Sequence, residues 1–245
     1  MAPDFDTFWG NGKIRIKFSP SKEVIEMDNI FQSRKTIRKY INKPVDKETL
    51  VKILEDATEA PSWANSQPWE IYVAAGEPLE QLRAAYLESF EKGDPGNLDI
   101  PAPKAWPDYI QDRMSKSAEK MFHAMGIARE DQEARKENWR NNFKFFDAPV
   151  AVFLCMDASL TEWSILDLGH FSASLMLAAK AHGLDSTPAA SSVSYPQHIR
   201  RILDVPDNQK IIVGIMLGYA DESHPYNKPD SSRVPLEEVV RFRGI

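Results

Sequence analysis

Two apolar runs of strand length, with an apolar helix between them, constrain the fold of this chain more than any other feature. Residues 149–156 and 210–219 are almost continuously hydrophobic, which is the pattern of central strands that are covered on both faces. Between the runs, residues 163–182 place apolar side chains around most of a helical circumference, and Gly183 follows as a typical helix terminator. We expect this helix to be buried on nearly all sides, as the core helix of a monomer or of a dimer.

Shorter patterns predict the other helices and strands. Asp46 caps a helix over residues 47–57 whose apolar residues recur every three to four positions, and a strand candidate follows at residues 71–73. Further helices are predicted from Pro78 to Phe90, from Pro196 onward and over residues 235–242. Strands that alternate with helices predict the α+β class, an α/β sandwich with helices outside a central sheet.

One segment interrupts this alternation. Residues 93–107 hold four prolines and two glycines, and residues 109–146 then show a helical pattern that breaks near Gly126. Long excursions of this kind are often lids or binding loops, and we interpret residues 93–146 as a cap inserted over a site. Because no linker-like tract divides the chain, we expect residues 1–245 to form a single domain, with residues 1–27 as an N-terminal extension.

Charge and composition argue against several classes of function. The formal net charge of −6 argues against general nucleic-acid binding, and no apolar run approaches the roughly 18 residues of a membrane span. We therefore expect a cytoplasmic protein without a nucleic-acid or membrane partner. The single cysteine, Cys155, lies within an apolar run and is interpreted as a buried strand thiol. Dinucleotide, P-loop and nucleophile-elbow motifs do not occur.

The histidines do not point to a metal site. None of the five has the spacing typical of metal ligands, so no metal site is predicted. Asp167 and His170 lie one turn apart in the apolar helix, which is most often the pattern of a histidine satisfied within a core. We leave both outside the predicted site.

A loop between two prolines is the first candidate for function. Pro61 and Pro68 restrict the backbone and remove donors, so neither regular element runs through residues 61–69. Asn65 and Gln67 offer amide donors and acceptors, and two tryptophans offer flat faces. The loop suits a flat ligand with polar edges; an aromatic turn that packs on its own core is the alternative.

A cluster of basic residues is the second candidate. Residues 29–45 contain five basic residues and no acidic one, in a chain where acids outnumber bases. On an extended segment Arg34, Thr36 and Arg38 share one side and present two guanidinium groups with a hydroxyl between them. This arrangement suits a phosphate, and a solvated basic turn is the alternative.

These segments occur in the order found in a known family. Residues 34–38, 61–69, 183–188 and 233–240 together resemble the FMN-dependent nitroreductases, over roughly residues 28–91 and 147–243. The resemblance implies a nitroreductase-like fold, with a mostly antiparallel central sheet flanked by helices, in an intertwined homodimer. It also implies FMN as the cofactor and NAD(P)H as the electron donor.

The resemblance assigns roles to three groups of residues. The FMN phosphate and ribityl chain would be held by Arg34, Lys35, Thr36, Arg38 and Arg233. The loop of the partner subunit would line the flavin with Pro61, Ser62, Trp63, Asn65 and Gln67. A backbone N–H near flavin N5 would come from the segment Pro188, Ala189, Ala190 and Ser191. Many relatives have an acidic residue and a glycine where Ala190 and Ser191 stand, which affects the expected ring contacts and substrate preference.

The implied activity depends on the cofactor. No catalytic side chain is predicted, because the chemistry takes place at flavin N5. Electrons would pass from NAD(P)H to nitroaromatic or quinone acceptors by a ping-pong mechanism in one shared pocket. The alternatives are a flavoenzyme of the same fold with another acceptor (ene reduction, reductive dehalogenation or flavin fragmentation), a non-catalytic flavin-binding protein, and a binding domain without flavin.

Overall fold

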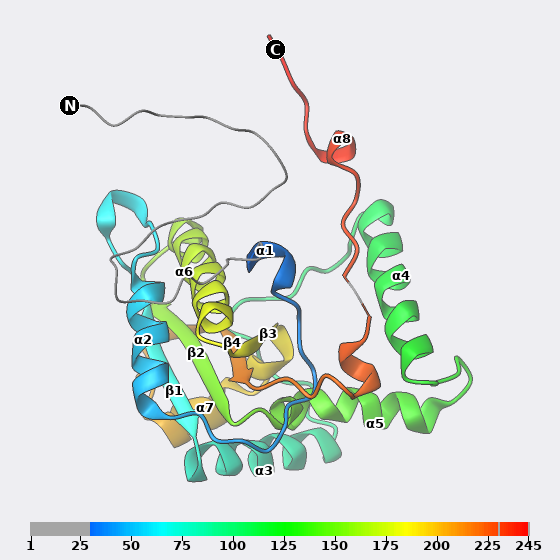
Figure 1. Ribbon diagram of the computed structural model, residues 1–245. Helices are drawn as coiled ribbons and strands as arrows, with labels where there is room; N and C mark the ends of the chain where they lie inside the picture. Colours follow the sequence, from blue (N-terminus) through cyan, green and yellow to red (C-terminus); the bar gives the residue numbers. More distant parts are fainter. Residues whose placement is uncertain (1–29, 230, 245) are drawn as a thin grey trace, which may run out of the picture.

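A four-stranded antiparallel sheet forms the centre of the molecule (Figure 1). The computed structural model describes residues 30–229 and 231–244, so the predicted extension 1–27 lies outside the described residues. The strands β1 (Glu70–Ala75), β2 (Val150–Asp157), β3 (Asp185–Ala189) and β4 (Gln209–Gly218) follow the order β1-β2-β4-β3. The two apolar runs are therefore the central strands, and the predicted α+β class is confirmed.

Helices cover both faces of the sheet. The helices α2 (Lys47–Thr58) and α6 (Glu162–Ala181) share one hydrophobic core with the even-numbered residues of β2, among them Val152 and Leu154. The helices α3 (Glu77–Glu91) and α7 (Pro196–Leu203) share the other core with Ala151, Phe153 and Cys155. Alternate residues of one strand thus face opposite layers, which explains why the run reads as continuously apolar.

The last strand in the sheet order, β3, was not predicted as a strand. Pro188 pairs with Ile215 of β4, and proline is tolerated on a strand that has a neighbour on one side only. On the other side of β3, Thr36 forms an isolated parallel bridge with Ser186, and the Ile37 N–H donates to the Ser186 carbonyl at 3.1 Å. The basic segment 34–38 therefore lies directly beside β3.

One face of α6 remains open in the single chain. Leu168, Phe171 and Leu175 are buried against the sheet, whereas Trp163 and Leu166 are 61% and 52% exposed. The expectation of burial on nearly all sides is therefore wrong for one chain. In the described part of the protein, the loop 61–67 covers this second apolar face only in part.

The segment 93–146 contains two helices after a long loop. The helix α4 (Asp108–Ala124) has no buried residue and stands at the side of the molecule beside the C-terminal segment (Figure 1). The helix α5 (Gln132–Phe143) packs against α3, where Phe143 stacks on Phe90 with ring centroids 4.8 Å apart. The predicted break between the two helices is confirmed.

Several short helices complete the described elements: α1 (Ile30–Ser33), η1 (Trp63–Asn65), η2 (Phe145–Asp147), η3 (Ala190–Val193), η4 (Pro225–Asn227) and α8 (Leu236–Val239). The final helix is shorter than the predicted span of residues 235–242, because Val240 is extended. Within the described residues, no helix has the length and apolarity needed to cross a bilayer. Cys155 is buried, and burial raises its pKa to about 12, so the thiol is protonated and unreactive as predicted.

Candidate functional site

The loop after α2 has an unusual backbone. Ala64, Asn65 and Gln67 have φ angles of 50°, 57° and 48°, in the left-handed region that costs a non-glycine residue about 1 kcal/mol or more. Such conformations persist only where surrounding contacts hold them, and they cluster at ligand sites. The loop 61–67 therefore has a defined conformation that its surroundings hold in place, rather than being an irregular connection.

Hydrogen bonds inside the loop keep the turn closed. The Asn65 N–H donates to the Ser62 carbonyl at 3.1 Å, and the Gln67 N–H donates to Ser62 Oγ at 3.0 Å. Gln67 Nε2 also donates to the Asn65 carbonyl at 3.2 Å. Ser62 thus organises the turn, and the Asn65 side chain remains exposed at its surface.

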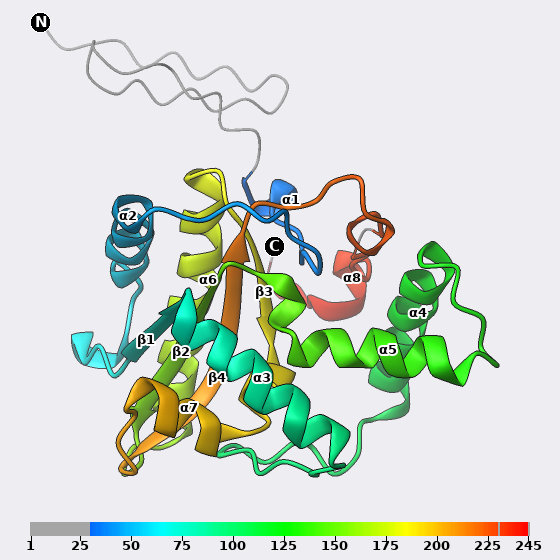
Figure 2. The same ribbon diagram turned by 90° about the horizontal axis from the view of Figure 1, so that it is seen from below.

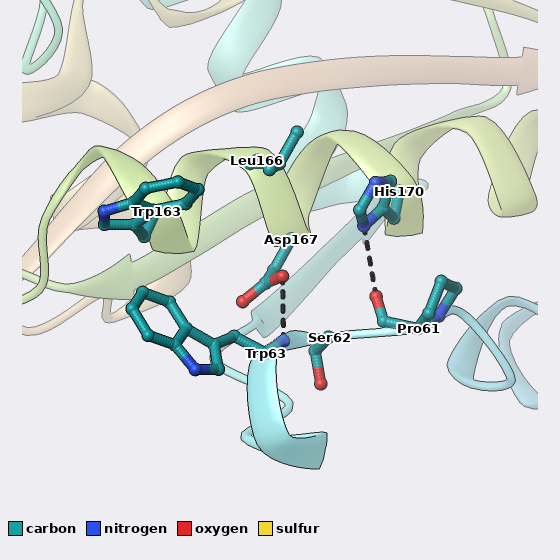
Figure 3. Close-up of a pocket in the computed structure, with 7 residues that line it drawn as sticks. All are labelled: Pro61, Ser62, Trp63, Trp163, Leu166, Asp167 and His170. Atoms are coloured by element: carbon teal, nitrogen blue, oxygen red, sulfur yellow. Dashed lines mark hydrogen bonds between the residues drawn. The ribbon is translucent and has the colours of Figure 1, made fainter.

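Two side chains of α6 attach the loop to the body of the protein (Figure 3). The Trp63 N–H donates to Asp167 Oδ1 at 3.1 Å, and His170 Nδ1 lies 3.3 Å from the Pro61 carbonyl. Because a carbonyl only accepts, Nδ1 carries the proton in this contact. His170 is exposed, so its interpretation as a core histidine is wrong, whereas Asp167 is buried. The sequence showed their helical spacing but not the loop opposite them.

A hollow of about 430 Å³ lies between the loop and α6 (Figure 3). The Trp63 ring meets the Trp163 ring edge to face, with centroids 5.2 Å apart and planes at 78°. Trp69, by contrast, is half-buried and packs on Phe171. The packing alternative therefore applies to Trp69, while Trp63 is 61% exposed. The hollow is lined by Pro61, Ser62, Trp63, Trp163, Leu166, Asp167 and His170.

Two arginines of the basic segment beside β3 have no carboxylate partner among the described residues. Ile37 is buried, and Arg34, Thr36 and Arg38, which were predicted to share one side, are each half-buried. Asn227 Oδ1 fixes the backbone by accepting from the Arg38 N–H at 2.8 Å. Among residues 30–229 and 231–244, neither the Arg34 nor the Arg38 guanidinium forms an ion pair with a carboxylate. Their charge is therefore available to an anion.

The segment 188–191 spans the end of β3 and the start of η3. Ser191 Oγ donates to Asn142 Oδ1 of α5 at 3.2 Å, and Ser192 Oγ donates to the Ala189 carbonyl at 2.6 Å. The Tyr86 hydroxyl donates to the Ser192 carbonyl at 2.7 Å. These bonds hold η3 firmly, and its first N–H groups, at Ala190 and Ser191, lack intrahelical acceptors as in any helix start.

The remaining predicted residues do not join these groups in one chain. Arg233 is exposed, and its Nη1 donates to the nearby Ser231 carbonyl at 2.9 Å. The loop 61–67 lies on one side of α6. The helix α1, which leads into segment 34–38, lies on the other side of α6 (Figures 1 and 2). In one chain the predicted site residues therefore form two groups, segments 34–38 and 188–191 along β3 and the loop 61–67 at α6, which we call the two half-sites of the predicted site. Lys35 belongs to the first half-site by position and is exposed.

Comparison with known proteins identifies the family. The model of the nitroreductase family matches residues 31–219. The chain belongs to the nitroreductase family. It is 35% identical over 221 residues to chloronitrobenzene nitroreductase of Comamonas testosteroni, with 88% of this chain and 96% of the relative covered. It is 34% identical over 224 residues to nitrobenzene nitroreductase of Ectopseudomonas oleovorans, with coverage of 88% and 96%.

Solved structures of other nitroreductases share the fold. NfnB from Sphigopyxis sp. strain HMH, described as FMN- and NADPH-dependent, aligns with a TM-score of 0.85 at 30% identity over 88% of this chain and 98% of its own. The FMN-dependent NfnB of Mycobacterium smegmatis, in complex with NADPH, aligns with a TM-score of 0.83 at 28% identity over 87% and 96%. The predicted nitroreductase-like fold is confirmed, and the protein is an oxidoreductase of this family.

Proposed function

We propose that this protein is an FMN-dependent enzyme that transfers electrons from NAD(P)H to nitroaromatic or quinone acceptors. The observation that carries the proposal is the pair of guanidinium groups, in the segment beside β3, that have no carboxylate partner among the described residues, in a chain whose relatives are named for nitrobenzene and chloronitrobenzene reduction. A cytoplasmic location, where reduced nicotinamide is available, is part of the proposal.

The residues present fit FMN chemically. Arg34 and Arg38 have no carboxylate partner among the described residues, and guanidinium groups bind phosphate through paired charge-assisted hydrogen bonds. Lys35, Thr36 and Arg233 would add donors from the same strand-like segment and from the C-terminal segment. A flat ring with polar edges suits the exposed Trp63 indole, the Asn65 and Gln67 amides and the start of η3.

When bound, FMN would supply the redox chemistry, taking hydride at N5 from NAD(P)H and reducing the acceptor in a ping-pong sequence. The chain's own residues would bind the cofactor and orient it toward the donor and the acceptor. Pro188 and Ala189 end β3, and a backbone N–H of Ala190 or Ser191 would face the reactive edge of the ring. No side chain is assigned as a catalytic acid or base.

The two half-sites support a homodimer. Within one chain the loop 61–67 and segment 34–38 lie on different sides of α6 (Figures 1 and 2). A second copy would bring the loop of one chain to the phosphate site of the other. The exposed apolar face of α6, with Trp163 and Leu166, would be covered in the same assembly.

The segment 93–146 is proposed as the cap of this single-domain enzyme. The helix α4 exposes Tyr109 by 60%, and Trp106 before it is 44% exposed. Polar contacts tie α4 to the C-terminal segment, since Arg113 pairs with Glu238 at 3.2 Å and Lys120 Nζ donates to Ser232 Oγ at 3.0 Å. An aromatic cap of this kind would contact the acceptor and influence its choice.

The test is the absorption spectrum of the purified protein with added FMN, followed by anaerobic titration with NADH or NADPH. We expect flavin bands that bleach with the donor and return when nitrobenzene or a quinone is added. Protein that takes up no FMN would overturn the proposal. Bound flavin that does not bleach would indicate a non-catalytic flavoprotein. Reduced enzyme that neither acceptor reoxidises would indicate another acceptor. Ala190 and Ser191, which replace an acidic residue and a glycine of many relatives, would be the first residues to consider in that case.

A further inference from the structure

The strained loop 61–67 needs an anchor outside itself. Its internal bonds, from Asn65 and Gln67 to Ser62, close the turn but join only residues of the loop. They do not determine where the loop lies on the protein. Three residues of this short loop have left-handed backbone conformations. The backbone would relax to a less strained conformation unless tertiary contacts held it in place.

Asp167 supplies such a contact. Its residue surface is only 4% exposed, and its Oδ1 accepts from the Trp63 N–H at 3.1 Å. No lysine, arginine or histidine in the described residues pairs with this carboxylate. A buried carboxylate without a cation is unfavourable unless hydrogen bonds compensate it. The backbone donor of Trp63 is the compensating partner that the structure provides.

The neighbouring contacts of α6 are weaker than this one. Trp163, Leu166, Asp167 and His170 follow helical spacing and face the loop together (Figure 3). His170 is exposed and its contact to the Pro61 carbonyl is longer, at 3.3 Å, so water competes for it. The Asp167 bond is charge-assisted and shielded.

We propose that Asp167 is a positioning residue: it holds the backbone of Trp63, and with it the turn that carries Asn65 and Gln67, in the orientation that meets the cofactor. It does so from α6 without touching the cofactor. The inference rests on the proposed function, since it assigns the flavin wall to this loop. It adds a residue that neither the family resemblance nor the comparisons assign.

The test compares Asp167→Ala, Asp167→Asn and Asp46→Ala in the full chain. Asp46 Oδ1 also accepts a backbone N–H, that of Thr49 at 2.8 Å, but caps α2 away from the loop, so it controls for general loss of stability. We expect Asp167→Ala to raise the Kd for FMN about tenfold, because one charge-assisted bond is lost. Asp167→Asn keeps an acceptor oxygen and should recover most of this loss, and Asp46→Ala should leave the Kd unchanged.

Amide hydrogen exchange of the flavin-free proteins separates this inference from the proposed function. We expect faster exchange at Trp63, Asn65 and Gln67 in Asp167→Ala, with Asp167→Asn and Asp46→Ala close to wild type there. Unchanged exchange and unchanged FMN affinity in Asp167→Ala would overturn the positioning role. Equal loss of affinity in Asp46→Ala would also overturn it, since instability alone would then suffice. If wild type does not bind FMN, the proposed function fails, while the exchange data still decide whether Asp167 holds the loop.

Discussion

Arg38 and Lys39 are adjacent cations with different surroundings. Lys39 Nζ pairs with Asp147 at 2.5 Å, whereas Arg38 has no carboxylate partner in the described residues. We expect Arg38→Ala to raise the Kd for FMN about tenfold to a hundredfold, the value of lost hydrogen bonds to a charged group. Lys39→Ala should change it less than about threefold, because its charge is already neutralised. Fluorescence titration with FMN measures both.

Arg233→Ala extends this test to the C-terminal segment. Its side chain is exposed and, among the described residues, hydrogen-bonds only to the nearby Ser231 and Ser232 carbonyls, so the Tm of the flavin-free protein should not change. Weakened FMN binding in both arginine variants would support the phosphate assignment. Wild-type affinity in both would contradict it.

His198 should make stability depend on pH. Burial lowers its pKa below the ordinary value of about 6.5, and Arg201 lowers it further. The unfolded chain therefore binds a proton at a higher pH than the folded protein does. Between the two pKa values, stability falls as the pH falls. We expect His198→Gln to weaken the loss of stability between about pH 6.5 and pH 5, measured by urea unfolding at both values. An identical loss in wild type and variant would show that other groups cause it.

At the scale of single residues, the sequence showed which residue types occur in each segment better than it showed which residues contact one another. The segment 34–38 lies beside β3 because Thr36 bridges Ser186, a contact that the residue types alone did not indicate. Asp167 and His170 were left out of the site because their partners lie 104 and 109 residues away in sequence. A helical pattern shows which residues share a face but not which segment packs against that face.

The packing of η3 on β4 depends on a glycine. A Cβ at Gly214 would collide with Ser192 Oγ and lie 3.0 Å from Ser192 Cβ and 3.1 Å from Phe153 Cε1. We expect Gly214→Ala to lower the free energy of unfolding by about 1–3 kcal/mol and to weaken FMN binding by displacing Ala190 and Ser191. Adding Ser192→Ala removes the hydroxyl and should recover part of both losses. Chemical denaturation and FMN titration of the two single variants and the double variant measure the coupling; strict additivity would contradict it.

Elements with strong periodicity were predicted, and those decided by tertiary contacts were not. The strands β2 and β4 and the helices α2, α3 and α6 lie within a few residues of their expected positions. The strand β3 was missed because Pro188 and small residues give no strand pattern, and pairing with β4 decides its conformation. The last helix was predicted too long: Leu236 and Val239 are exposed in the single chain, so no packing there extends the helix beyond Val239.

At the scale of the whole molecule, the proposed division of the site between two chains makes a prediction about mixed dimers. Chains with Arg38→Ala lose the phosphate half-site, and chains with Asn65→Ala lose the loop half-site. A heterodimer of the two, purified through two different tags, should contain one intact site and recover about half of the wild-type activity. Each variant homodimer should keep low activity, because both of its sites carry a defect. If both half-sites act within one chain, every site in the heterodimer carries a defect and activity does not return.

The sequence predicted the class and the family, and the family resemblance implied a site divided between two chains, which stays a prediction. Within one chain, α6 separates the loop 61–67 from segment 34–38 (Figures 1 and 2). Its apolar circumference predicted burial on nearly all sides, in the core of a monomer or of a dimer, because composition does not show whether a helix face is covered by the same chain or by another. Trp163 and Leu166 are apolar residues of α6 that the single chain leaves exposed.

The edge-to-face contact of Trp63 and Trp163 also gives the protein a built-in optical reporter. Two indoles with centroids 5.2 Å apart couple their electronic transitions, so the pair should contribute a circular dichroism signal that neither ring gives alone. One ring belongs to the loop and the other to α6, and the signal therefore reports the separation of these two elements. Movement of the loop can be followed in solution by light alone, without any added label.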